Sequence, residues 1–142
     1  MTDRLRVPFF VLRLSIGIFL LQWTIEKFVR PDHTSDIFKW MYGLQLDPSW
    51  PPLLGAVELL IVLAFIVGFR KRISYATVFV MHFISVASTW EIMLHPYTSP
   101  VPGRNLYMTA VPVLVAMGML YRLRDLDSLW SVDAWLAQRQ KS

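Results

Sequence analysis

The chain of 142 residues contains no cysteine, and only 17% of its residues are charged. Without a thiol it can form no disulfide and cannot bind zinc or an iron–sulfur cluster through sulfur, so redox chemistry would need a bound cofactor or a partner chain. It also lacks a phosphate-binding loop, a GxSxG nucleophile motif and a dinucleotide fingerprint. A soluble domain has about a quarter of its residues charged, so the shortage of charge points away from an aqueous surrounding.

Apolar residues make up 55% of the chain and gather in four blocks separated by charged or proline-rich breaks. A hydrocarbon core about 30 Å thick needs roughly 20 mostly apolar residues in a helix to cross it. The sequence therefore predicts an all-α membrane four-helix bundle in a single domain, 1–142. Its transmembrane helices are expected at about residues 7–28, 52–69, 73–94 and 105–121, and Pro112 should kink the fourth because proline removes a backbone hydrogen bond.

Two further segments are expected to be short amphipathic helices lying at the membrane surface. In residues 34–45 Ile37, Phe38, Met41 and Tyr42 recur at helical spacing, and Thr34 could cap the N-terminus. In residues 126–137 Trp130 and Trp135 lie among charges, and tryptophan prefers the headgroup boundary.

The positions of lysine and arginine predict the orientation. The ends of the chain and the turn Arg70–Lys71–Arg72 carry most of them, which places both termini in the cytoplasm. Because these residues cluster at the ends of apolar blocks, the net charge of +4 indicates a lipid membrane rather than nucleic acid as partner. The first apolar block contains Arg13 and lacks a small-residue cleavage site, so we expect a retained helix rather than a signal peptide.

Polar residues from all four predicted helices should share one layer near the outer membrane surface. Glu58 is the most informative, because an unpaired charge in the membrane is costly; Lys27 and Arg104 are its candidate partners. Such a layer could bind a ligand or only hold the bundle together, and the residues alone do not decide between these. Its members are Gln22, Glu26, Lys27, Glu58, Glu91, His95, Arg104 and Asn105.

Two ionisable residues are predicted deeper in the membrane. Arg13 should either extend to the cytoplasmic surface or pair inside the bundle. His82 and His95 lie on one predicted helix with their rings about 140° apart, which argues against haem. Glu58, Glu91 and His95 have suitable chemistry for a metal, but no helical ligand spacing supports it, and we predict no metal site.

Short motifs mark the first two predicted helices and the end of the chain. The first helix contains Arg13-Leu-Ser-Ile-Gly17 and ends in Glu26-Lys27-Phe28; the second contains Gly55-Ala-Val-Glu58 and Gly68-Phe-Arg-Lys-Arg72. The chain ends in Arg122-Leu-Arg-Asp-Leu-Asp127-Ser-Leu129. Together these motifs resemble the DoxX family of small four-helix membrane proteins. The resemblance implies a four-helix bundle in the bacterial inner membrane, in a family that includes a subunit of a thiosulfate:quinone oxidoreductase. Arg13, Lys27 and Glu58 match the family pattern.

Three functions follow as hypotheses. The first is an accessory or quinone-interacting subunit of a membrane redox system, with quinone as the cofactor and Glu58, Glu91 and His95 as proton-relay groups. The second is a small-molecule or proton-coupled carrier that uses Glu58 and His82. The third is a structural or assembly subunit without a ligand. Each implies a further membrane protein subunit or a homo-oligomer as partner.

Overall fold

A computed structural model describes residues 3–98 and 104–140, and its regular elements in these ranges are all helical, which confirms the all-α prediction. The elements in chain order are α1 (Asp3–Val29), α2 (Pro31–Tyr42), α3 (Trp50–Ile66), α4 (Lys71–Ser88), α5 (Trp90–Leu94), the 3₁₀ helix η1 (Arg104–Thr109), α6 (Ala110–Arg122) and α7 (Val132–Arg139).

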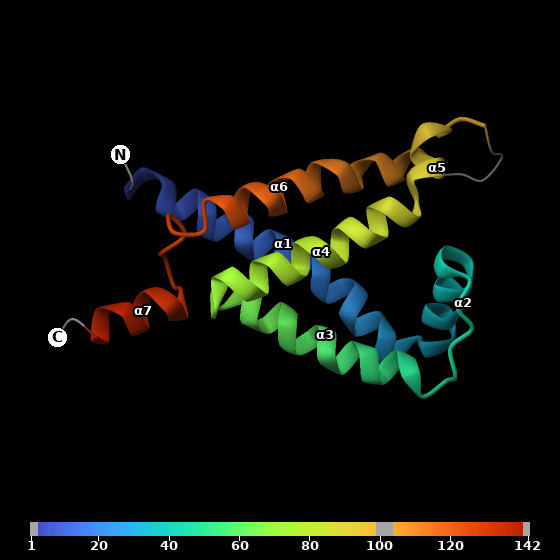
Figure 1. Ribbon diagram of the computed structural model, residues 1–142, viewed down its shortest axis with the longest axis horizontal. Helices are drawn as coiled ribbons and strands as arrows, with labels where there is room; N and C mark the ends of the chain where they lie inside the picture. Colours follow the sequence, from blue (N-terminus) through green and yellow to red (C-terminus); the bar gives the residue numbers. More distant parts are fainter. Residues whose placement is uncertain (1–2, 99–103, 141–142) are drawn as a thin grey trace.

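The long helices α1, α3, α4 and α6 pack along one another (Figure 1). α1 packs on α3 and α4 on α6, and contacts of α3 with α4 and of α1 with α6 join the two pairs. The start of α1, the turn between α3 and α4, and α7 lie at one end of the molecule, called here the α7 end. The end of α1, α2, the start of α3 and α5 lie at the other, the α2 end.

A narrow core runs between the long helices. All four contribute to it, with Ile16, Leu20, Val62, Phe65, Tyr75, Val78, Met117 and Leu120 buried together. Gly17 and Gly55 bring α1 and α3 close: a Cβ at Gly17 would collide with the Ile66 side chain, and one at Gly55 would lie 3.0 Å from the Phe28 ring. Small residues are what allow such close helix contacts where lipid replaces water.

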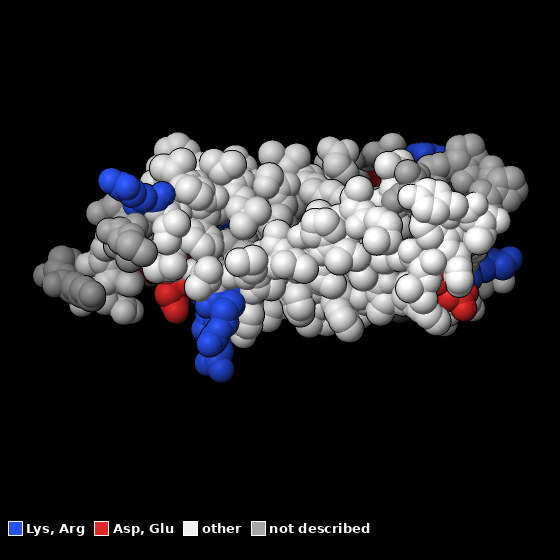
Figure 2. All heavy atoms as spheres, turned by 90° about the horizontal axis from the view of Figure 1, so that it is seen from above, with Lys and Arg blue, Asp and Glu red and all other residues white. Residues whose placement is uncertain are grey.

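The outward faces of the long helices are apolar. Leu60 is 71% exposed, and Val11, Ile73 and Val115 are each more than half exposed. Figure 2 shows the charged side chains near the two ends of the molecule, with a broad uncharged middle on the face in view. An exposed apolar surface of this extent is expected of a protein that contacts lipid or another protein.

Among the described residues one helical stretch, Arg4–Val29, is by itself long and apolar enough to cross a membrane. Only 22% of its most apolar window is buried in the protein, whereas the core helix of a soluble domain would be mostly buried. Trp50–Ile66 and Leu106–Arg122 are apolar but shorter.

Both predicted surface helices are displaced from their expected positions. α2 begins at Pro31 rather than Thr34, because proline at the first helical position is already set to a helical φ. Thr34 is buried within α2 and does not cap it, and Gly43 ends the helix with a left-handed φ of 68°. α7 begins at Val132 rather than residue 126, because residues 123–131 make tertiary contacts in place of helical ones.

The third and fourth long segments are each interrupted. The third breaks at Thr89, whose hydroxyl donates to the carbonyl oxygens of Ser85 and Val86, and α5 then continues the chain. In the fourth, a 3₁₀ turn precedes α6, and Pro112 lies in the first turn of α6. Proline cannot donate to the carbonyl four residues before it, so the interruption falls upstream of Pro112 rather than at a kink in mid-helix.

Candidate functional site

An ion pair between α1 and α3 neutralises Glu58 near the α2 end. Lys27 Nζ lies 2.7 Å from Glu58 Oε2, and Thr24 Oγ1 donates to Glu58 Oε1 at 3.0 Å. Lys27 also donates to the Trp23 carbonyl oxygen at 3.1 Å. The side chains of Lys27 and Glu58 are 13% and 12% exposed, so the pair is largely shielded from the surroundings. The close approach at Gly55, one turn before Glu58, brings the two helices within reach of each other.

A second and deeper ion pair lies at the α7 end. Arg13 Nη1 is 2.9 Å from Asp127 Oδ1, and both side chains are fully buried. Arg13 Nη2 also donates to the carbonyl oxygens of Leu129 and Trp130, at 2.8 and 3.0 Å. The Tyr75 hydroxyl donates to Asp127 Oδ2 at 2.6 Å. The arginine of α1 thus binds the segment after α6 and, through Asp127, contacts α4 as well.

Lys71, the first residue of α4, extends this arrangement, and we call Arg13, Lys71, Tyr75 and Asp127 the Arg13 network. Lys71 Nζ donates to the carbonyl oxygens of Arg124 and Asp127 at 3.0 and 2.9 Å. Three segments distant in the sequence are therefore held by one set of buried charges.

The turn between α3 and α4 packs closely against the Arg13 network. Gly68 has φ +63°, and a Cβ there would lie 2.8 Å from Arg13 Nη1 and 2.9 Å from Ser131 Oγ. Ser131 Oγ donates to the Gly68 carbonyl oxygen, and the Val132 amide donates to the Val67 carbonyl oxygen. The Asp133 carboxylate accepts from the backbone amides of Arg70 and Lys71, both at 2.8 Å. The C-terminal segment thereby closes the α7 end.

The DoxX family model matches residues 9–91, more than half of the chain. The chain belongs to the DoxX family. This confirms the resemblance seen in the sequence and identifies a family of membrane-associated proteins. No curated protein and no solved structure matches the chain.

The family match contains Arg13, Lys27, Glu58 and Gly68 but ends before Asp127. In this DoxX protein the motif residues of α1 and α3 therefore have defined structural roles: Lys27 and Glu58 pair with each other, and Gly68 makes room for Arg13. Arg13 pairs with a residue of the C-terminal segment, which lies outside the matched range.

Among the outer-layer residues whose side chains the structure describes, Gln22, Glu26, Glu91 and His95 make no hydrogen bond or ion pair with Glu58. Glu26 Oε1 lies 2.8 Å from His33 Nδ1 and 3.8 Å from Arg30, at the junction of α1 and α2. Gln22 is exposed. The predicted layer is divided, because the charged groups of α1 pair with α3 or with the start of α2.

Glu91 and His95 are both exposed and lie one turn apart, with the His95 amide donating to the Glu91 carbonyl oxygen at 3.2 Å. In the part of the chain that the structure describes, no side-chain interaction connects either residue to Glu58. Arg104 and Asn105 begin η1, but their side chains lie outside the described residues.

His82 is buried between helices. Its Nε2 lies 3.0 Å from the Ala110 carbonyl oxygen of α6, and its ring meets the Phe19 ring edge-on with centroids 5.7 Å apart. Across residues 3–98 and 104–140, no three acidic or histidine side chains are grouped so that they could hold a metal ion. His82 thus serves as a contact among α1, α4 and α6.

Sequence reasoning missed Thr24, Lys71, Tyr75 and Asp127. A threonine or tyrosine in an apolar block gives little signal, because either residue is also common at helix contacts. Arg13 did give a signal, since a buried arginine requires an anionic partner. The segment after α6, which belongs to the C-terminal part predicted to be cytoplasmic, contains Asp125, Asp127 and Asp133, and only the path of the chain after α6 selects Asp127.

Proposed function

We propose that this DoxX protein crosses the bacterial inner membrane four times, through α1, α3, α4 with α5, and η1 with α6. The supporting observation is the placement of polarity: large apolar side chains are exposed along these helices, while Arg13, Lys27 and Glu58 face inward and are paired. Charges inside a membrane protein normally face the bundle interior and pair with one another. The interrupted helices reach the required length as α4 plus α5 and as η1 plus α6.

Within that membrane we infer an accessory role in a quinone-linked redox system, with another membrane subunit as partner. The buried charged groups are paired: Glu58 forms an ion pair with Lys27 and accepts a hydrogen bond from Thr24, and Arg13 forms an ion pair with Asp127. Groups held in this way stabilise a helix arrangement rather than carry protons or substrate. The same pairing gives no support to a carrier mechanism based on Glu58. The resemblance to a family with a quinone-linked oxidoreductase subunit supports the redox context.

Direct contact with a quinone is the second candidate, and the Glu91–His95 pair favours it. An acidic side chain and an imidazole are exposed one turn apart at the α2 end, where they can exchange protons with a bound headgroup. The quinone would then lie against the outside of α5 and leave the Glu58–Lys27 pair untouched.

Co-purification in native-lipid nanodiscs followed by mass spectrometry tests both roles. We would compare the parent with Glu91→Gln/His95→Gln, and with Gln22→Ala as a control, since Gln22 is also exposed near the α2 end. A stoichiometric membrane partner retained by all three proteins, with no quinone, supports the accessory role. A quinone held by the parent and the control but lost from the double variant supports direct contact. Retention of neither partner nor quinone contradicts both.

A further inference from the structure

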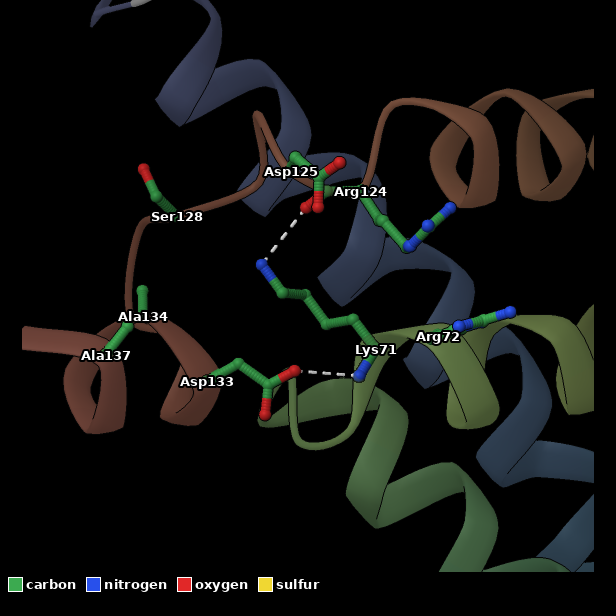
Figure 3. A pocket seen from close by; sticks show the side chains of 8 residues that line it. All are labelled: Lys71, Arg72, Arg124, Asp125, Ser128, Asp133, Ala134 and Ala137. Atoms are coloured by element: carbon green, nitrogen blue, oxygen red, sulfur yellow. Dashed lines mark hydrogen bonds between the residues drawn. The ribbon is translucent and has the colours of Figure 1, made fainter. Parts of the chain in front are cut away.

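An open cavity of about 420 Å³ lies at the α7 end, beside the Arg13 network (Figure 3). It is bounded by the first turn of α4, the segment after α6 and one side of α7. Its lining residues are Lys71, Arg72, Arg124, Asp125, Ser128, Asp133, Ala134 and Ala137.

The cations of this cavity have donors that the fold does not use. Arg72 is exposed and makes no ion pair with any residue that the structure describes. Arg124 stacks its guanidinium on the Tyr121 ring, 4.9 Å from the centroid, and uses Nη1 on the Tyr121 carbonyl oxygen. Figure 3 shows Arg72 and Arg124 extending toward the same side of the view. Lys71 Nζ has three protons and donates two hydrogen bonds to carbonyl oxygens.

The two carboxylates of the cavity differ in their state. Asp133 is occupied, because its two oxygens accept from the backbone amides of Arg70 and Lys71. Asp125 is exposed, and no salt bridge engages it in the described part of the chain. The cavity therefore presents two guanidinium groups with unused donors and one carboxylate without a bound cation.

The position of the cavity indicates which ligand can reach it. Apolar surface begins within about one turn of the two arginines, with Ile73 58% and Leu123 38% exposed. Trp130 and Trp135 are both exposed nearby on the C-terminal segment, and tryptophan prefers the membrane boundary. A ligand at this level would have its polar part among the arginines and its apolar part along the helices.

We propose that this cavity binds the phosphate group of a phospholipid headgroup through Arg72 and Arg124. Planar guanidinium groups suit phosphate because they donate two parallel hydrogen bonds to its oxygens. Asp125 adds selectivity for a headgroup that carries an ammonium group, such as ethanolamine, over one that ends in glycerol. The proposal rests on the membrane insertion proposed above and is independent of the redox role.

Matched variants make the test specific. Arg72→Gln/Arg124→Gln removes both proposed phosphate ligands, whereas Arg70→Gln/Arg122→Gln removes the same charge from the same two segments but not from the cavity lining. Each full-length protein would be titrated in detergent with short-chain phosphatidylethanolamine, phosphatidylglycerol or inorganic phosphate, with bound molecules counted by native mass spectrometry. Extraction of the parent from membranes by alkaline carbonate alone would contradict membrane insertion separately.

We expect phosphatidylethanolamine to bind the parent and the Arg70/Arg122 variant equally, and at least about tenfold more weakly to the Arg72/Arg124 variant. Asp125→Asn should remove the preference for ethanolamine over glycerol headgroups. Binding of inorganic phosphate as tight as that of the lipid, with the same dependence on Arg72 and Arg124, would support the phosphate site and assign it to a soluble anion. Equal lipid binding by the two double variants would overturn the proposal.

Discussion

Arg13 and Asp127 show what a single pair of residues contributes to this fold. Each is fully buried, and a buried charge is costly unless its partner and its remaining donors are satisfied. Here Asp127 neutralises the guanidinium through Nη1, two carbonyl oxygens accept from Nη2, and Tyr75 donates to the carboxylate; the buried Nε of Arg13 has no hydrogen-bond partner among the described residues. The pair therefore specifies one position for the segment after α6, because another position would leave a charge unpaired.

Removing one partner should be more harmful than removing both. Asp127→Asn leaves Arg13 buried without a counter-charge and should destabilise the protein by about 3–5 kcal/mol. Arg13→Met/Asp127→Leu should recover much of that loss, because the double variant buries no charge. Thermal unfolding in nanodiscs would measure both effects. Arg30→Gln is the control: it breaks an exposed contact of 3.8 Å and should cost less than about 1 kcal/mol. Additive single-variant losses at Arg13 and Asp127 would contradict the pairing.

Gly68 is required for two separate reasons, its conformation and its surroundings. Gly43 has a similar φ of +68°, but a Cβ added there meets nothing within 4 Å. Gly43→Ala should therefore cost only the left-handed conformation, about 1 kcal/mol. Gly68→Ala adds a clash with Arg13 and Ser131 and should cost clearly more, about 2–3 kcal/mol. Equal shifts in the unfolding temperature of the two variants would show that crowding at Gly68 is unimportant.

At the scale of the helices, α4 depends on a residue distant in the sequence. Arg70 precedes it with φ +45° and makes no side-chain cap, so the first amides of the helix need another acceptor. Asp133 provides it from the start of α7. The contact of Asp133 therefore both docks α7 and caps the start of α4. The same contact positions two residues of the cavity lining, Lys71 and Asp133.

Asp133→Ala should accordingly loosen two elements. We expect faster hydrogen exchange at the Arg70 and Lys71 amides, faster proteolysis between α6 and α7, and a loss of about 1–2 kcal/mol, as for other helix caps. Asp36→Ala, at an exposed position of α2, is the control and should change none of these. Unchanged exchange at both amides would show that the contact with Asp133 does not support the helix.

The whole molecule has the polarity expected in a membrane. Along the described helices the exposed middle is apolar, and the two ends carry the charge. Burial of apolar side chains in water cannot be the main stabilising force for such a surface, so close packing at Gly17 and Gly55 and the two internal ion pairs become important. The four-span topology proposed here places the α7 end in the cytoplasm.

The topology is readily tested because the chain has no native cysteine. Ser49→Cys lies between α2 and α3, and Gln138→Cys lies on α7; both positions are exposed. A membrane-impermeant maleimide should label Ser49→Cys in intact spheroplasts and Gln138→Cys only in inverted vesicles. Labelling of both from the same side would contradict the proposed orientation.

The helical class, the apolar segments, the family and the presence of charges that needed partners could all be predicted from the amino-acid sequence. These follow from composition and from periodicity along the chain, which are local properties. The predicted start of α2 was too late, at Thr34 instead of Pro31, and the predicted start of α7 was too early, at Leu126 instead of Val132. Helix ends depend on tertiary contacts as well as on propensity. The three-dimensional path of the chain was needed to show that Arg13 pairs with Asp127, that Asp133 caps α4, and that no side-chain interaction joins Glu91 or His95 to Glu58 among the described residues. The physical reason is that these outcomes depend on where the chain returns after α6 and on which helices are neighbours, and neither is encoded in local spacing.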